Sequence, residues 1–148
     1  MEISVGMLVD YEGALARRVA GSVWSGLSRA ALEEGAGCVK TTATWDGLDE
    51  SSEAEVAEAA IRIFVLDHEY PEAIDALGRT SGGARLYGLV LAVPERPNPL
   101  AGSLLYQGVE RLQESGIKPG YVEPALLRAD TGECERYAGK LLDRLKVH

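Results

Sequence analysis

Residues 86–93 read Leu-Tyr-Gly-Leu-Val-Leu-Ala-Val, eight positions without a charged side chain. Such a run is typical of a strand that is covered on both faces, as the strands of a parallel sheet are. Pro94 follows it and begins an irregular segment that holds three prolines before Gly102. Four other segments are predicted as strands: residues 3–9, 38–45, 61–66 and 120–127.

Helical patterns separate these strands. Apolar residues recur at every fourth position from Leu15 to Ala31, which predicts a helix over residues 14–34 with one buried stripe. Thr131 is expected to cap the last helix of the chain. That last helix is predicted at residues 132–145, and three more helices are predicted at residues 53–60, 71–77 and 104–114.

The alternation of strands and helices favours an α/β fold. Parallel strands need crossover helices, and right-handed crossovers cover both faces of the sheet. We therefore expect a three-layer, doubly wound, five-stranded parallel sheet, flavodoxin-like, with strand order 2-1-3-4-5. The 148 residues fit a single domain over residues 1–148.

Composition narrows the class of function. The formal net charge is -8, and an acidic chain repels phosphate backbones, so we expect neither nucleic acid nor a membrane as a partner. A cytoplasmic location is the default, since no signal-peptide pattern opens the chain. Cys38 and Cys134 lack metal-ligand spacing and are expected to be reduced thiols. The scarcity of Asn and Gln is typical of a thermophile.

Topology gives the place of a site. In doubly wound sheets, ligands bind beyond the carboxyl ends of the strands, where the strand order reverses. In the order 2-1-3-4-5 this point lies between strands one and three. The loops expected to face it are residues 10–14, 67–71 and 94–102.

Two stretches carry a resemblance to a known family. They are Glu69-Tyr70-Pro71-Glu72-Ala73-Ile74-Asp75-Ala76-Leu77, followed by the strand from Tyr87 to Val93, and Asn98-Pro99-Leu100-Ala101-Gly102 with the helix behind it. Their order resembles that of flavodoxin-like NADPH-dependent FMN reductases. The resemblance implies FMN, with its phosphate wrapped by the first loop and its ring flanked by the other two. The cofactor-binding residues implied in this way are Tyr11, Glu12, Gly13, Ala14, His68, Glu69, Tyr70, Pro94, Asn98 and Gly102.

The first loop departs from that family. Its phosphate loops are rich in Ser, Thr, Asn and Gly, whereas residues 10–16 here read Asp-Tyr-Glu-Gly-Ala-Leu-Ala. The N-terminus of a helix normally attracts a phosphate. Here Asp10 and Glu12 would place negative charge beside that phosphate and repel it. Two hypotheses follow. The chain is an FMN-binding oxidoreductase or electron-transfer module, or it is a non-enzymatic domain on the same fold that binds a partner or assembles with itself and has lost flavin binding.

Other residue patterns point less specifically to chemistry. Asp10, Glu12, Asp67, His68 and Glu69 would suit a hard cation such as Mg²⁺, although loop carboxylates more often cap helices or face water, and no metal is predicted. His68 is a candidate general base near neutral pH, but no catalytic side chain is assigned. The expected partners are a small-molecule ligand or a protein, a second copy of the chain included.

Overall fold

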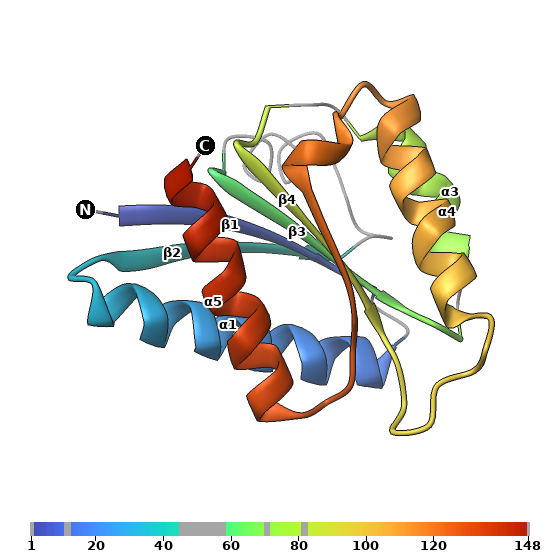
Figure 1. The fold of residues 1–148 in the computed structure, drawn as a ribbon, viewed down its shortest axis with the longest axis horizontal. Helices are drawn as coiled ribbons and strands as arrows, with labels where there is room; N and C mark the ends of the chain where they lie inside the picture. The colour runs from blue at the N-terminus through green and yellow to red at the C-terminus, as the bar shows by residue number, and fades with distance from the viewer. Residues whose placement is uncertain (1, 11–12, 45–58, 70–71, 81–82, 148) are drawn as a thin grey trace.

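The chain forms one α/β sheet with helices on both sides (Figure 1). The structure, a computed structural model, describes residues 2–10, 13–44, 59–69, 72–80 and 83–147. Its strands are β1 (Glu2–Val9), β2 (Gly37–Thr44), β3 (Ile61–Asp67), β4 (Leu86–Ala92) and β5 (Val122–Leu127). Its α-helices are α1 (Ala14–Glu33), α3 (Glu72–Ala76), α4 (Ala101–Glu114) and α5 (Thr131–Val147), with 3-10 turns η2 (Leu77–Arg79) and η3 (Pro119–Tyr121).

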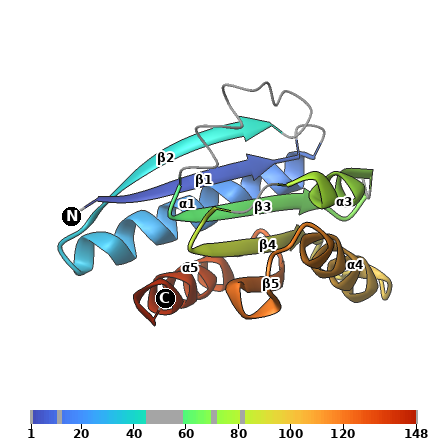
Figure 2. The same ribbon diagram turned by 90° about the horizontal axis from the view of Figure 1, so that it is seen from above.

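The strand order is β2-β1-β3-β4-β5, and every neighbouring pair is parallel. Viewed from above, the strands run side by side in this order (Figure 2). The α/β class, the parallel sheet and the order expected from the sequence are therefore confirmed. β1 and β3 are direct neighbours, with Val5 opposite Ile61 and Val9 opposite Val65.

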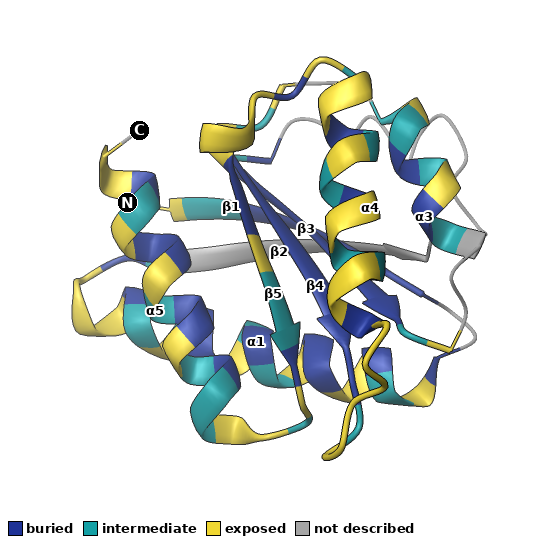
Figure 3. Ribbon diagram, turned by 45° about the vertical axis from the view of Figure 1, so that its right-hand side comes forward, coloured by how far each residue is buried: buried dark blue, intermediate teal, exposed yellow. Residues whose placement is uncertain are grey.

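Two apolar layers enclose the sheet. Helices α1 and α5 cover one face and α3 and α4 cover the other (Figure 2). Strand β3 serves both layers, because Ile63 and Val65 pack toward α1 and α5 while Phe64 and Leu66 pack toward α3 and α4. All seven residues of β3 are buried (Figure 3), which accounts for its nearly continuous apolar sequence.

Several element boundaries differ from the sequence prediction. Helix α4 begins at Ala101 and not at Leu104, because the N–H of Leu104 already bonds to the carbonyl of Leu100. Helix α5 includes Thr131 as its first residue, and Asp130 caps it instead, through a carboxylate that accepts the N–H of Glu133 at 2.9 Å.

Three further differences concern the start of β5, the predicted helix over residues 53–60 and the end of the second strand. Residues 119–121 form the 3-10 turn η3, so β5 begins two residues later than predicted. The predicted helix over residues 53–60 lies outside the described residues except for Ala59 and Ala60, which are not helical. The predicted second strand ends at Thr44 in the described part, and Trp45 lies outside it.

Helices α1 and α5 approach each other closely at a glycine. A Cβ placed on Gly26 of α1 would lie 3.0 Å from the Cβ of Ala138 and 3.1 Å from the Cα of Glu135. Small residues at this crossing let the two backbones meet, and they seal the apolar layer between them. Within the described residues no helix, the 20-residue α1 included, is apolar enough to cross a membrane.

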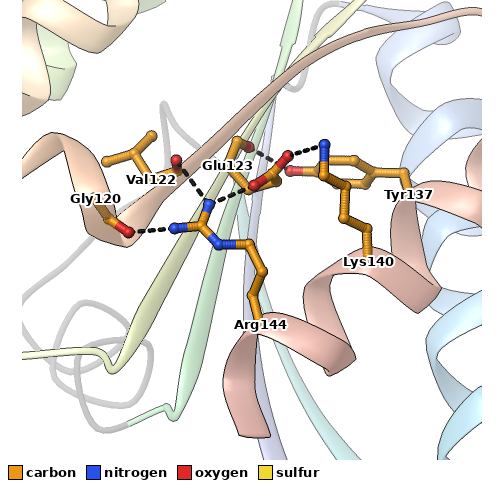
Figure 4. Close-up of polar contacts among 6 residues, drawn as sticks. All are labelled: Gly120, Val122, Glu123, Tyr137, Lys140 and Arg144. Atoms are coloured by element: carbon orange, nitrogen blue, oxygen red, sulfur yellow. Dashed lines mark hydrogen bonds and ion pairs between the residues drawn. The ribbon is translucent and has the colours of Figure 1, made fainter. Parts of the chain in front are cut away.

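A buried carboxylate ties the edge strand β5 to α5 (Figure 4). Glu123 is 7% exposed, and its two oxygens pair with Lys140 at 2.7 Å and with Arg144. Arg144 also donates to the carbonyls of Val122, at 3.1 Å, and Gly120. The Tyr137 hydroxyl donates to the Glu123 carbonyl at 2.7 Å, so one strand position is anchored through both its backbone and its side chain.

The charge state of Glu123 follows from these contacts. Burial alone would raise its pKa, but the hydrogen bonds from Lys140 and Arg144 outweigh burial, and the pKa of Glu123 lies below its usual value. Burial, with the charge of Glu123 nearby, raises the pKa of Tyr137. Tyr137 is therefore a neutral donor inside the core, in the space left by Gly88, where a Cβ would lie 2.8 Å from the Tyr137 hydroxyl oxygen.

The close helix crossing predicts opposite effects for two glycines of α1. Gly26→Val should lower the free energy of unfolding by about 1–3 kcal/mol, because the new side chain meets the α5 backbone. Gly21→Ala should raise it by about 0.5–1 kcal/mol, since nothing lies within 4 Å of a Cβ there and alanine favours helix. Urea unfolding measures both; equal effects of the two substitutions would contradict the crossing described here.

The Glu123 contacts predict a pH-dependent loss of stability. Glu123→Gln should cost about 1.5–3 kcal/mol at neutral pH, because the amide cannot pair both cations. In the unfolded chain the pKa of Glu is about 4.3, and in the fold it is lower, so the wild-type advantage is complete above about pH 4.3. It should disappear as the pH falls through the folded pKa.

Urea unfolding at several pH values, with the exposed Glu110→Gln as the matched control, checks this. The control should shift stability by no more than about 0.5 kcal/mol. A gap between the wild type and Glu123→Gln that persists unchanged at low pH would show that the Glu123 charge is not what holds β5.

Candidate functional site

The carboxyl ends of β1, β3 and β4 form one continuous edge. The N–H of Asp10, just after β1, donates to the carbonyl of Val65 in β3 at 3.0 Å. The N–H of His68, just after β3, donates to the carbonyl of Ala92 in β4 at 3.3 Å. These bonds bring the loops after β1, β3 and β4 together, as the topology predicted.

Helix α1 starts at this edge without a side-chain cap. Its N-cap is Gly13, which has extended backbone (φ -93°, ψ 103°) and whose carbonyl accepts the N–H of Arg17 at 3.1 Å. The N–H of Gly13 bonds back to the carbonyl of Asp10 at 3.3 Å. A helix of 20 residues carries a partial positive charge at such an end, where its first amides lack intrahelical partners.

The carboxylate of Asp67 packs directly against this helix start. A Cβ placed on Gly13 would lie 2.5 Å from Oδ2 of Asp67 and 2.7 Å from its Cβ, so only glycine fits at the N-cap. The Asp67 side chain is 4% exposed, and its Oδ1 accepts the N–H of Glu69 at 3.0 Å. Nδ1 of His68 lies 3.4 Å from the same oxygen.

A second carboxylate lies at the same edge. Asp10 is 5% exposed, and Asp67 as a whole residue is 3% exposed, so water screens both only weakly. At about 5 Å and an effective dielectric constant of about 20, one unit charge repels a like charge by roughly 3 kcal/mol. Since a bound phosphate carries up to two negative charges, this edge opposes it near the start of α1.

The structure brings together part of the predicted site. Gly13 is buried and Ala14, the first residue of α1, is exposed, both beside the end of β3. His68 is mostly buried beside Asp67, and Glu69 is exposed. Tyr11, Glu12 and Tyr70 lie outside the described residues.

The third loop, residues 94–102, runs from the end of β4 into the start of α4. Pro94 is half-buried after β4. Asn98 uses its Oδ1 to accept the N–H of Leu100 at 2.9 Å, so its side chain begins the turn that leads into α4. Gly102 was expected in a loop but lies in the first turn of α4, exposed, with open space where a Cβ would be.

A cavity of about 490 Å³ opens at the same edge, beside the ends of β4 and β5. Its volume falls within the usual range of small-molecule sites, about 300–1,000 Å³. Pro94, which was predicted to bind the cofactor, lines this cavity. The full lining is Leu15, Arg18, Val93, Pro94, Glu95, Arg128, Ala129 and Asp130.

Sequence reasoning missed the β5 side of this cavity. Arg128 follows β5 directly, and its guanidinium pairs with Glu133 at 2.7 Å. Arg18 reaches the cavity from the first turns of α1. The position of Arg128 after the fifth strand was the available signal, because every loop that follows a parallel strand meets the same edge.

The buried cysteine does not supply a nucleophile. Cys134 in α5 is fully buried, and burial raises the pKa of its thiol to about 11. Its sulfur faces the carbonyl of Arg128 at 3.6 Å. Among the described residues, no group of three or more His, Cys, Asp or Glu side chains is arranged to hold a metal ion.

Among the solved structures that match this chain, two share its fold along nearly their whole length. The NAD(P)H:quinone oxidoreductase from Methanothermobacter marburgensis matches with a TM-score of 0.57 and 10% identity, over 99% of this chain and 98% of that chain. The diflavin flavoprotein A3 from Nostoc sp. matches with a TM-score of 0.55 and 16% identity, over 100% and 99%. No protein-family model matches this chain, and no curated protein matches its sequence.

These similarities establish the fold. At 10% and 16% identity they do not extend to individual residues, but both superpositions span the sheet and its helices from end to end. The flavodoxin-like fold inferred from the order of strands and helices is thus confirmed.

The contact between Gly13 and Asp67 predicts a sensitive position. Gly13→Ala should lower the melting temperature by several degrees, because the new Cβ would overlap the buried carboxylate. Gly102→Ala is the matched control, since it adds the same methyl in the first turn of α4, where nothing lies within 4 Å. Equal melting temperatures for Gly13→Ala and the wild type would show that Asp67 does not pack there.

Proposed function

We propose that this chain is an oxidoreductase or electron-transfer domain that binds a flavin ring at the carboxyl edge of its sheet. The observation that carries the proposal is the flavodoxin-like sheet, which spans the whole chain and joins the loops after β1, β3 and β4 at one edge. The names of two proteins with this fold, a quinone oxidoreductase and a diflavin flavoprotein, support a redox role.

The ring would lie along the loop after β4. Val93, Pro94 and Ala129 give the neighbouring cavity an apolar wall, which suits a flat ring system. Charged groups stand at its rim, where Arg18 and Arg128 face solvent. A bound flavin would supply the electron transfer itself, and the protein's part would be to position the ring and to exclude water from one side of it.

The phosphate of FMN does not fit the start of α1 as that helix is arranged here. The buried carboxylate of Asp67 lies against Gly13, and Asp10 adds a second negative charge. The cofactor role that the resemblance gives to residues 11–14 therefore lacks support at Gly13. No chemical step is assigned to FMN, and no side chain is assigned as an acid or a base.

The same observation favours a second candidate function. A domain whose helix start is filled by its own carboxylate would act through protein contacts rather than through a cofactor. Exposed apolar side chains on and just before α4, Tyr106 at 64% and Leu100 at 65%, offer a surface for a partner or a second copy. This candidate predicts a colourless protein that binds no flavin.

A flavin-binding experiment separates the two functions. Titration of riboflavin with the purified chain, followed by flavin fluorescence, should show saturable quenching. Ala129→Trp should weaken binding at least about tenfold by filling the cavity, whereas Ala84→Trp, at the opposite edge of the sheet, should not.

Chemical reduction of the bound flavin and its reoxidation by a quinone would then test the redox role. A purified chain without a visible flavin band that also fails to quench added riboflavin would contradict the proposal and leave the non-enzymatic candidate.

A further inference from the structure

We infer that this edge discriminates against phosphate and binds an uncharged flavin, of the riboflavin class, in preference to FMN. The inference rests on the proposed function, since it concerns which flavin that site would take. Its basis is the disagreement between the phosphate role that the resemblance gives to the start of α1 and the residue found there, Asp67.

The space beside Gly13 is already filled. The Asp67 carboxylate comes so close to Gly13 that not even a methyl group fits between them, because a Cβ on Gly13 would lie 2.5 Å from Oδ2. A phosphate is far larger than a methyl group. It could not approach Gly13 from the side on which a Cβ would lie unless the carboxylate left its place.

The Asp67 carboxylate is held in this position. Asp67 is the last residue of β3 and pairs with Ala92 of β4, so its backbone is fixed by the sheet. Its Oδ1 accepts the N–H of Glu69 at 3.0 Å, and its side chain is 4% exposed. Rotation away from Gly13 would break this bond and move the charge out of contact with the helix start.

Buried negative charge at this edge also opposes a phosphate. Asp10 and Asp67 are both buried at this edge, and the chain as a whole has a formal net charge of -8. The nearest arginines along α1, Arg17 and Arg18, are exposed, so water and salt screen their charges more than those of the carboxylates. Arg128, at the rim of the cavity, is likewise exposed and is paired with Glu133. A phosphate dianion at the start of α1 therefore lies beside two buried carboxylates that repel it, while riboflavin, which is uncharged, meets no such repulsion.

Parallel titrations with riboflavin and FMN test this selectivity. The wild type should bind riboflavin at least about tenfold more tightly than FMN. In Asp67→Ser the shorter side chain loses both the charge and the bulk beside Gly13, and the preference should fall toward equality. Asp75→Asn, which removes an 82% exposed carboxylate on α3, is the matched control and should leave the ratio at the wild-type value.

A second variant, Asp67→Asn, keeps the size of the side chain and the acceptor for the Glu69 N–H, so it should lose only the electrostatic part of the preference. Melting temperatures verify folding for both. FMN binding as tight as riboflavin binding in the wild type would overturn the inference and leave the proposed function standing. An unchanged ratio in folded Asp67→Ser would also overturn it. If neither flavin binds the wild type, the proposed function fails and the inference fails with it.

Discussion

The parallel pairing of β1 with β3 is the constraint on which the site depends. It places the residue that caps α1 beside the last residue of β3, and so brings Gly13 against Asp67. A strand inserted between these two would separate the residues. Because the pairing is held by backbone hydrogen bonds and by two apolar layers, the contact between helix start and carboxylate follows from the fold itself.

That contact serves stability at a cost to phosphate binding. A carboxylate near the start of a long helix interacts favourably with the partial positive charge there, and α1 has no side-chain cap of its own. The same place in a flavodoxin-like fold is where the resemblance would put a phosphate. Glu123, on the edge strand β5, contributes to stability, because its two oxygens pair with Lys140 and Arg144.

The sequence was informative about the fold and less so about the site. Apolar strands such as residues 61–66 and 86–93, with helices between them, led to the sheet and its order. Gly102 was misplaced because the Asn98 side chain starts a turn that local patterns did not reveal. The acidic first loop indicated that negative charge near the start of α1 would repel a phosphate. That Asp67 rather than Asp10 would lie against Gly13 depends on contacts between distant segments, which a local pattern does not encode.

The most direct test of this account is a crystal structure of the chain grown in a high concentration of inorganic phosphate. The account predicts that the Asp67 carboxylate stays against Gly13, with its Oδ1 bonded to the N–H of Glu69, and that no anion lies at the start of α1. A phosphate bound to the first amides of α1, with Asp67 turned away from Gly13, would contradict it.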